Sequence, residues 1–176
     1  MTEPSATEIR SERLVLRRLT LDEARAVVAL DRVGSRWAAD YPTEGDLIVA
    51  GIACEAGEHY DETGDFGVYQ VLLSDTDEVV GGIGFIHPPL RGEVEVGYGL
   101  AESARGHGLA TEALRAVAEW ASQHGVVTMV AMTATDNVAS QRVVERVGFT
   151  RSPDPVVDPE DGPLWRWELG LPATTS

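Results

Sequence analysis

Apolar residues alternate or recur with helical spacing along most of the chain, and the changes of pattern mark its elements. Residues 14–19 (LVLRRL) predict a first strand. Thr20 and Glu23 have the spacing of a capping box, in which each side chain bonds to the other residue's backbone. A helix should therefore begin after Thr20. Beyond a loop, Asp46 is the expected cap of a second helix that runs to about residue 56.

The middle of the chain predicts three short strands. Residues 57–65 are polar and predict a loop. Three runs rich in strand-forming residues follow, separated only by turn clusters, at 66–73, 78–87 and 93–100. Because consecutive strands with short connections usually pair antiparallel, we expect a meander here.

From Leu109 onward the apolar spacing becomes helical. The residues that share this spacing are Ala110, Ala113, Leu114, Val117, Ala118 and Ala121. The helix should end at Gly125, and residues 126–134 (VVTMVAMTA) predict a buried strand. A strand, a helix and a second strand form a βαβ unit, so the two outer strands should pair in parallel.

A short helix is expected over residues 138–147. Either Asp136 or Asn137 would cap it, and Gly148 would end it. Phe149 should then return the chain to the sheet.

The C-terminal part predicts one more strand. Residues 153–163 are proline-rich and acidic and predict a loop, and residues 164–169 predict the strand. Alternation places Trp165, Trp167 and Leu169 on one face of it.

The composition is that of one globular domain, with 176 residues, 43% of them hydrophobic and 24% charged. We place this domain over residues 1–176, with its core at about 13–170. The formal net charge of −15 would repel a phosphate backbone, which argues against nucleic acid as a partner. Such an acidic surface either serves solubility alone or attracts cationic partners.

Nothing in the sequence predicts a membrane segment or a metal. It contains no apolar run of about 18 residues, and residues 1–12 lack the apolar stretch of a secretory leader. A single cysteine, Cys54, agrees with a cytoplasmic location. The four histidines are scattered without the spacing of metal ligands.

Residues 105–111 (RGHGLAT) lie between a strand and an amphipathic helix. Gly106 and Gly108 would let several backbone N–H groups point to one spot at the positive end of the helix. The segment is either a cradle for phosphate or a plain strand-to-helix turn. A Walker A loop does not fit, because Leu109 and Ala110 stand where it needs Lys and Ser or Thr.

This segment resembles the Arg/Gln-x-x-Gly-x-Gly/Ala motif of the GNAT N-acetyltransferase superfamily, with Arg105, Gly108 and Ala110 at its fixed positions. The neighbouring segments 95–100 (EVGYGL) and 137–149 (NVASQRVVERVGF) are similar to the branch that contains the ribosomal-protein N-terminal acetyltransferases. The resemblance covers about residues 13–170.

The resemblance implies an α/β fold whose mixed sheet of about seven strands is flanked by helices and splays at its centre to hold acetyl-CoA. Gly97 and Gly99 would allow a bulge that frees backbone N–H groups for this cosubstrate. The acceptor would be a primary amine, either a protein N-terminus or a small molecule. The residues expected to bind acetyl-CoA are Tyr98, Gly99, Leu100, Arg105, Gly106, His107, Gly108, Leu109, Ala110, Thr111 and Asn137.

Acetyl transfer needs a proton acceptor, because only a neutral amine attacks the thioester. Glu93 and Glu95 share one face of their strand. The resemblance favours Glu95 as the catalytic base, and Glu93 or water are the alternatives. A backbone N–H near Leu100 would stabilise the oxyanion.

The group that protonates the departing thiolate is less clearly marked. Many relatives carry a tyrosine four residues before the Gly-Phe pair, but Val144 stands there in this chain. Ser140, which the resembling branch shares, is the expected catalytic substitute, unless the thiolate leaves without an acid. Asn137 either only caps its helix or also bonds to pantetheine.

Two function classes follow, an N-acetyltransferase and a non-catalytic acyl-CoA-binding module. Because relatives often pair and Trp165 and Trp167 add apolar area, we also expect a weak homodimer. Carboxylates would steer a cationic acceptor to the slot. These are Glu44, Asp46, Asp154, Asp158, Glu160 and Asp161.

Overall fold

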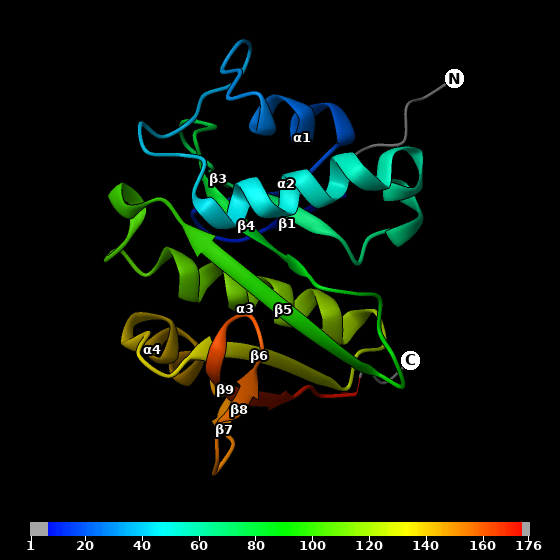
Figure 1. Cartoon of the computed structure of the whole chain (residues 1–176), viewed down its shortest axis with the longest axis vertical. Coiled ribbons are helices and arrows are strands. Elements are labelled where there is room, and N and C mark those ends of the chain that lie inside the picture. Colours follow the sequence, from blue (N-terminus) through cyan, green and yellow to red (C-terminus); the bar gives the residue numbers. More distant parts are fainter. Residues whose placement is uncertain (1–6, 174–176) are drawn as a thin grey trace.

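The computed structural model describes residues 7–173 and is built around one sheet (Figure 1). Its strands are β1 (Glu8–Arg10), β2 (Leu14–Arg18), β3 (Val68–Leu73), β4 (Val79–Phe85), β5 (Glu93–Leu100), β6 (Thr128–Ala134), β7 (Thr150–Arg151), β8 (Val156–Asp158) and β9 (Gly162–Gly170). Its α-helices are α1 (Leu21–Val28), α2 (Glu44–Ala56), α3 (Leu109–Gln123) and α4 (Val138–Val147). Two short 3₁₀ segments are η1 (Gly57–Thr63) and η2 (Glu102–Ala104).

The sheet has the strand order β1-β2-β3-β4-β5-β6-β9-β7, and β8 pairs with β9. Strands β3, β4 and β5 form the expected antiparallel meander. Strand β5, helix α3 and strand β6 form the expected βαβ unit, with β5 and β6 in parallel. The mixed α/β architecture is therefore confirmed, with nine strands in the sheet instead of about seven.

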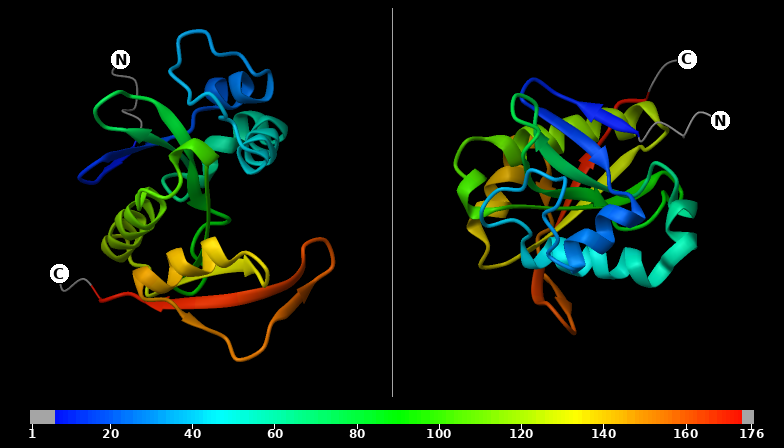
Figure 2. Two further views of the ribbon diagram at one scale, coloured as in Figure 1. Left: turned by 90° about the vertical axis from the view of Figure 1, so that its left-hand side faces the viewer. Right: turned by 90° about the horizontal axis from the view of Figure 1, so that it is seen from above.

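The helices are divided between the two sides of β5 (Figures 1 and 2). Helices α1 and α2 lie together on one side, whereas α3 and α4 lie on the other. Side chains of a strand point alternately to its two faces. We call the face of β5 that carries Glu95, Gly97 and Gly99 the α2 face, and the face that carries Val94, Val96 and Tyr98 the α3 face. Val94 and Val96 are fully buried against the α3 side of the core.

Helices α1 and α2 both begin with a capping box. In each, a threonine N-cap accepts from the backbone N–H of the residue three positions on, whose carboxylate accepts from the threonine N–H. The box of α1 joins Thr20 and Glu23 as expected. The prediction that Asp46 caps α2 is wrong, because Thr43 is the cap and Asp46 is the carboxylate partner.

Three further expectations need correction. Residues 57–65, predicted as a loop, contain the 3₁₀ segment η1. The proline-rich segment 153–163 contains β8, which pairs with the start of β9 because a turn with Gly162 at φ 77° reverses the chain. Strand β1 was not anticipated, since three residues are too short to show a pattern.

The two tryptophans of β9 pack within the chain. Trp167 is 2% exposed, and its indole N–H donates to Thr133 Oγ1 at 2.8 Å. Trp165 is half-buried under the Arg151 guanidinium, 4.3 Å from its ring centre. Trp167 is therefore part of the core and Trp165 is partly covered, so the two tryptophans give little support to the expected homodimer.

None of the helices within residues 7–173 is both long enough and apolar enough to cross a membrane.

Candidate functional site

Strands β5 and β6 separate halfway along their length. Their parallel pairing joins Glu93 to Thr128 and ends at Val96 and Ala131. The remainder of β6 pairs only with β9, as far as the described strands go, and the remainder of β5 pairs only with β4. A gap therefore opens in the middle of the sheet, beside Tyr98, Gly99 and Leu100.

Two backbone N–H groups of β5 face this gap. Ile86 N–H donates to Glu95 O, and Ala101 N–H donates to Val80 O. Odd-numbered residues of β5 therefore bond to β4, and even-numbered residues point toward β6. Beyond the last pair, the even-numbered residues are Tyr98 and Leu100. Their N–H groups are directed into the gap, and Leu100 O accepts from Arg105 Nε at 3.0 Å.

The predicted bulge at Gly97 and Gly99 is wrong. The pairing of β5 with β4 runs in unbroken register from Val96 opposite Phe85 to Leu100 opposite Gly81. The backbone groups are free because β6 diverges from β5, and no residue is inserted in the ladder.

A glycine-rich turn leads from the gap into α3. Gly106 and Gly108 have φ values of 80° and 77°, in the left-handed region that suits glycine. Gly108 is the N-cap of α3 and supplies no side-chain cap, so the first helical N–H groups lack a side-chain partner. Arg105, Gly106 and His107 are exposed. This arrangement can bind an anion such as pyrophosphate.

The turn is held from outside by the N-terminal part of the chain. Arg13 Nη1 donates to His107 O at 2.9 Å, and Arg13 Nε contacts Glu112 Oε2 at 2.7 Å. Glu112 Oε1 accepts from Ser11 Oγ and from the Arg13 backbone N–H, both at 2.7 Å. A carboxylate in the first turn of α3 thus positions the arginine that supports the glycine-rich turn.

Helix α4 closes the opposite side of the gap. Asn137 Oδ1 accepts from Ser140 N–H at 3.1 Å, so Asn137 and not Asp136, the other expected candidate, is the cap. The hydroxyl of Tyr98 lies 3.0 Å from Ser140 Oγ and 3.1 Å from Ser140 O. Burial raises the pKa of Tyr98, and the bond to Ser140 only partly opposes this. The phenol therefore keeps its proton at neutral pH.

The two glutamates of β5 differ in their surroundings. Glu93 is exposed and forms an ion pair with Arg166 at 3.2 Å. Glu95 is half-buried on the α2 face, beside Val130 of β6. Gly99 lies four residues further, about 13 Å along an extended strand. A proton moving from the level of Gly99 to Glu95 would travel through water.

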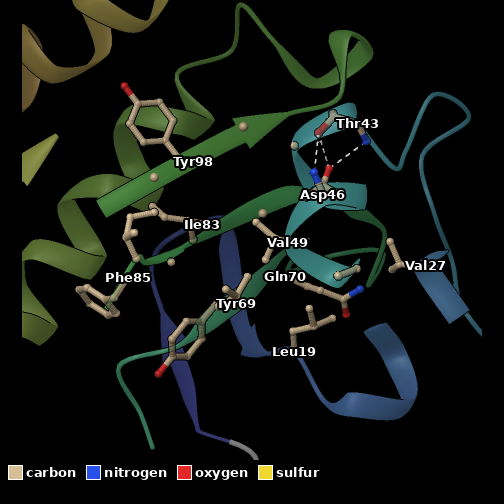
Figure 3. A pocket seen from close by; sticks show the side chains of 18 of the residues that line it. Leu19, Val27, Thr43, Asp46, Val49, Tyr69, Gln70, Ile83, Phe85 and Tyr98 are labelled. Atoms are coloured by element: carbon tan, nitrogen blue, oxygen red, sulfur yellow. Dashed lines mark hydrogen bonds between the residues drawn. The ribbon is translucent and has the colours of Figure 1, made fainter. Parts of the chain in front are cut away.

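A pocket of about 170 Å³ lies on the α2 face of β4 and β5 (Figure 3). No side chains rise from its floor at two cross-strand pairs, because both partners in each are glycines: Gly82 with Gly99 and Gly84 with Gly97. Its walls are apolar and come from α1, α2 and β3. Asp46 reaches over this floor from the first turn of α2. Burial raises the pKa of Asp46, and its bonds to Thr43 only partly oppose this.

The predicted site residues fall into one connected arrangement and one separate segment. Tyr98 meets Ser140 across the gap, Gly99 and Leu100 follow it on β5, and segment 105–111 continues beyond the end of this strand. The acidic residues of segment 154–161 lie instead just before β8, at its end and in the turn into β9. There Asp158 Oδ1 accepts from Glu160 N–H at 2.8 Å and Asp161 N–H at 2.9 Å, which gives it a structural task in the turn.

Sequence reasoning missed two features of this arrangement. It treated Asp46 as a helix cap and as one of several steering charges, and it gave the Tyr98 hydroxyl no role. Strand alternation could have revealed the paired glycines of β4 and β5. No local pattern brings Tyr98 to Ser140, because 42 residues separate them.

The family model of the acetyltransferase (GNAT) domain matches residues 13–150, so the chain belongs to this family of acetyltransferases. Over 89 residues it is 34% identical to the uncharacterized N-acetyltransferase YjdG of Bacillus subtilis (strain 168). This match covers 49% of the chain and 53% of that protein, so the chain spans about half the length of this curated relative.

Two solved structures are similar over nearly the whole chain. An acetyltransferase from Agrobacterium tumefaciens str. C58 is 28% identical, with a TM-score of 0.67 over 96% of this chain and 97% of that one. The ribosomal-protein alpha-N-acetyltransferase RimL in complex with coenzyme A is 19% identical, with a TM-score of 0.72 over 94% and 98%. The similarity to RimL shows that this chain and RimL share a fold.

Proposed function

We propose that this protein transfers the acetyl group of acetyl-CoA to a primary amine. The observation that carries the proposal is the gap between β5 and β6, which leads into the glycine-rich turn at the start of α3. Free strand N–H groups suit the thioester and amide oxygens, and a helix N-terminus suits the pyrophosphate of the same ligand. Membership of the acetyltransferase family and the coenzyme A bound to RimL support this assignment.

The residues of the gap and the turn would hold the cosubstrate. The strand edge would bond to the acetyl and pantetheine oxygens, the turn would bind the pyrophosphate, and the free amide nitrogen of Asn137 would reach the pantetheine. We assign cosubstrate binding to Tyr98, Gly99, Leu100, Arg105, Gly106, His107, Gly108, Leu109, Ala110, Thr111 and Asn137.

The reaction would proceed by direct attack in a ternary complex. The neutral amine forms a bond to the thioester carbon, and the oxyanion is stabilised by the N–H of Tyr98 or Leu100. The C–S bond then breaks, and the sulfur leaves as a thiolate. Glu95 accepts the ammonium proton through water, and the Tyr98–Ser140 pair supplies a proton to the thiolate.

The acceptor would be a protein N-terminus or a small amine, and we propose one acetyltransferase domain over residues 1–176 that acts in the cytoplasm. The net charge of −15 supports a cationic acceptor and disfavours nucleic acid as a partner.

Calorimetric titration of CoA into the wild type and Gly108→Glu tests cosubstrate binding. The new carboxylate would stand in the anion site, so we expect about 100-fold weaker binding or more, roughly the loss of one charged contact and its replacement by repulsion. Gly34→Glu is the matched control, because Gly34 has φ 79° and open space around it and therefore imposes the same backbone strain. Equal CoA affinity in all three proteins would refute the anion site.

Thiol release from acetyl-CoA in the presence of amines tests catalysis. Amine-dependent release is expected from the enzyme. Tight CoA binding without release for any amine would instead support the non-catalytic acyl-CoA-binding module.

A further inference from the structure

The pocket on the α2 face is built around one carboxylate. Of the described residues that line it, Asp46 alone carries a charge. Asp46 Oδ2 is used in the capping box, where it accepts from Thr43 N–H at 2.9 Å and from Thr43 Oγ1 at 2.6 Å. Within residues 7–173, Oδ1 has no hydrogen bond or ion pair among those that the structure records. One oxygen of a half-buried carboxylate is therefore free to bind a ligand.

The paired glycines explain how this oxygen reaches the sheet. A Cβ on Gly82 would lie 2.6 Å from Asp46 Oδ1, far closer than such atoms approach. The glycine therefore admits the carboxylate onto the floor of the pocket. Gly82 pairs with Gly99. This places Oδ1 at the level of β5 where the N–H groups of Tyr98 and Leu100 face the gap.

The remainder of the pocket is mainly apolar, and its tyrosine hydroxyls already have partners: Tyr41 contacts Gln70, Tyr69 donates to Asp65 O, and Tyr98 contacts Ser140. Leu19, Val27 and Val49 form walls around the floor (Figure 3), and Val68 also lines the pocket. The one buried amide, Gln70, is already engaged, because its Nε2 lies 3.4 Å from Tyr41 Oη and its Oε1 lies 3.4 Å from Arg17 Nη2. An acceptor with further polar or charged groups would leave them without partners here, which costs binding free energy.

The size of the pocket limits the acceptor further. Its volume of about 170 Å³ lies below the roughly 300–1,000 Å³ of pockets that hold drug-sized ligands. A short alkyl chain or a single ring suits such a space, whereas a polyamine or an extended peptide does not.

From this geometry we infer that Asp46 binds the ammonium group of the acceptor, and that the acceptor is a compact primary amine with an apolar body. This inference rests on the proposed acetyl transfer and names the substrate class for the same site. The carboxylate holds the amine nitrogen beside the acyl carbon, on the α2 face. After loss of a proton the nitrogen attacks, as described above. Asp46 is thus a substrate-binding residue as well as a capping residue, because capping uses only Oδ2 and leaves Oδ1 for the substrate.

A matched pair of amines tests the apolar body. Butylamine and 1,4-diaminobutane differ only in a second ammonium, which would enter the apolar part of the pocket. We expect kcat/KM for butylamine to exceed that for 1,4-diaminobutane by about 10-fold or more, since an unpaired charge is costly there. Equal or better use of the diamine, or of a short peptide through its N-terminus, would overturn the inferred substrate class.

Asp46→Asn tests the carboxylate. The amide oxygen can still accept from Thr43, but the negative charge is lost. We expect KM for butylamine to rise about 10- to 100-fold, the usual worth of a charged hydrogen bond. KM for acetyl-CoA should stay the same. Gly82→Ala, which displaces Oδ1 without removing it, should act in the same direction. An unchanged KM for butylamine in Asp46→Asn would overturn the role of Asp46.

Glu23→Gln is the control for the capping role, because it neutralises the carboxylate of the matching box of α1, where Glu23 also pairs with Arg17 at 2.8 Å. It should lower the melting temperature at least as much as Asp46→Asn and leave both KM values unchanged. Calorimetry of CoA, and then of butylamine in the presence of CoA, distinguishes a failure of the proposed function from a failure of the inference about Asp46. Failure to bind CoA would contradict the proposed function, whereas CoA binding without butylamine binding or acetylation would contradict only this inference.

Discussion

Tyr98 of β5 and Ser140 of α4 place their hydroxyl oxygens 3.0 Å apart across the gap in the sheet. The two residues are 42 positions apart in sequence. Position 144, where the family resemblance led us to expect a tyrosine, holds the buried Val144. The pair offers a proton beside the place where the thiolate would leave. Ser140 was the donor expected from the sequence, and the structure adds the Tyr98 hydroxyl beside it, which the sequence did not predict.

Tyr98→Phe removes the hydroxyl and keeps the ring that packs against the core. If the pair protonates the thiolate, kcat should fall by about 10- to 100-fold, at the lower end of general acid catalysis, with little change in CoA affinity. Ser140→Ala should lower kcat as well, and the double variant should lose little more, because the two hydroxyls act as one unit. Steady-state kinetics on the four proteins would reveal this, and a wild-type kcat in both single variants would mean that the thiolate needs no acid.

Glu95→Gln should lower kcat/KM at neutral pH and remove the decline of the rate at acidic pH, because the amide cannot accept a proton. Glu93→Gln is the comparison, since it changes a carboxylate on the same face that is already paired with Arg166. A pH–rate profile changed only in Glu93→Gln would move the role to Glu93. Profiles unchanged in both would assign proton acceptance to water or another group.

Glu112→Gln should make the protein less stable at neutral pH. Burial alone would raise the pKa of Glu112, but the bonds from Ser11 and Arg13 and the Arg13 charge hold it below its usual value of 4.5. A carboxyl with a lowered folded-state pKa stabilises the fold above the unfolded-state pKa, and this stabilisation is lost as the pH falls through the folded-state value.

We therefore expect Glu112→Gln to lower the free energy of unfolding by about 1–3 kcal/mol at pH 7 and by much less at acidic pH. Urea unfolding between pH 3 and pH 7 measures this difference. Glu119→Gln, on an exposed position of the same helix, is the control and should have little effect. A loss of equal size at every pH would show that the effect comes from packing and not from the carboxylate charge.

The acidic segment 154–161 predicts a salt dependence. If it steers a cationic acceptor, kcat/KM should fall as ionic strength rises, and Asp154→Asn with Glu160→Gln should flatten that fall. Asp158 is left intact because it holds the turn between β8 and β9. Neutralising the exposed Glu55 and Glu58 instead is the control for net charge. If kcat/KM does not depend on ionic strength, the acidic residues do not steer the acceptor and serve only solubility.

Local chemistry made much of the fold predictable. The Thr20–Glu23 box, the Asn137 cap and the left-handed Gly148 each follow from contacts within a few residues of each other. The same holds for the turn 105–111, whose glycines and following helix are adjacent in sequence. The cap of α2 follows from local chemistry too, because Thr43 and Asp46 have the same spacing as Thr20 and Glu23.

The sequence by itself determined the family, the βαβ unit and the glycine-rich turn, because these depend on residues that are close along the chain or spaced at regular intervals. Only the tertiary structure decided where β5 leaves β6, which hydroxyl meets Ser140, and that the free oxygen of Asp46 lies over Gly82. These relationships join segments that are distant in sequence. They depend on sheet register and helix packing, which bring residues together through the whole core and leave no local pattern to read.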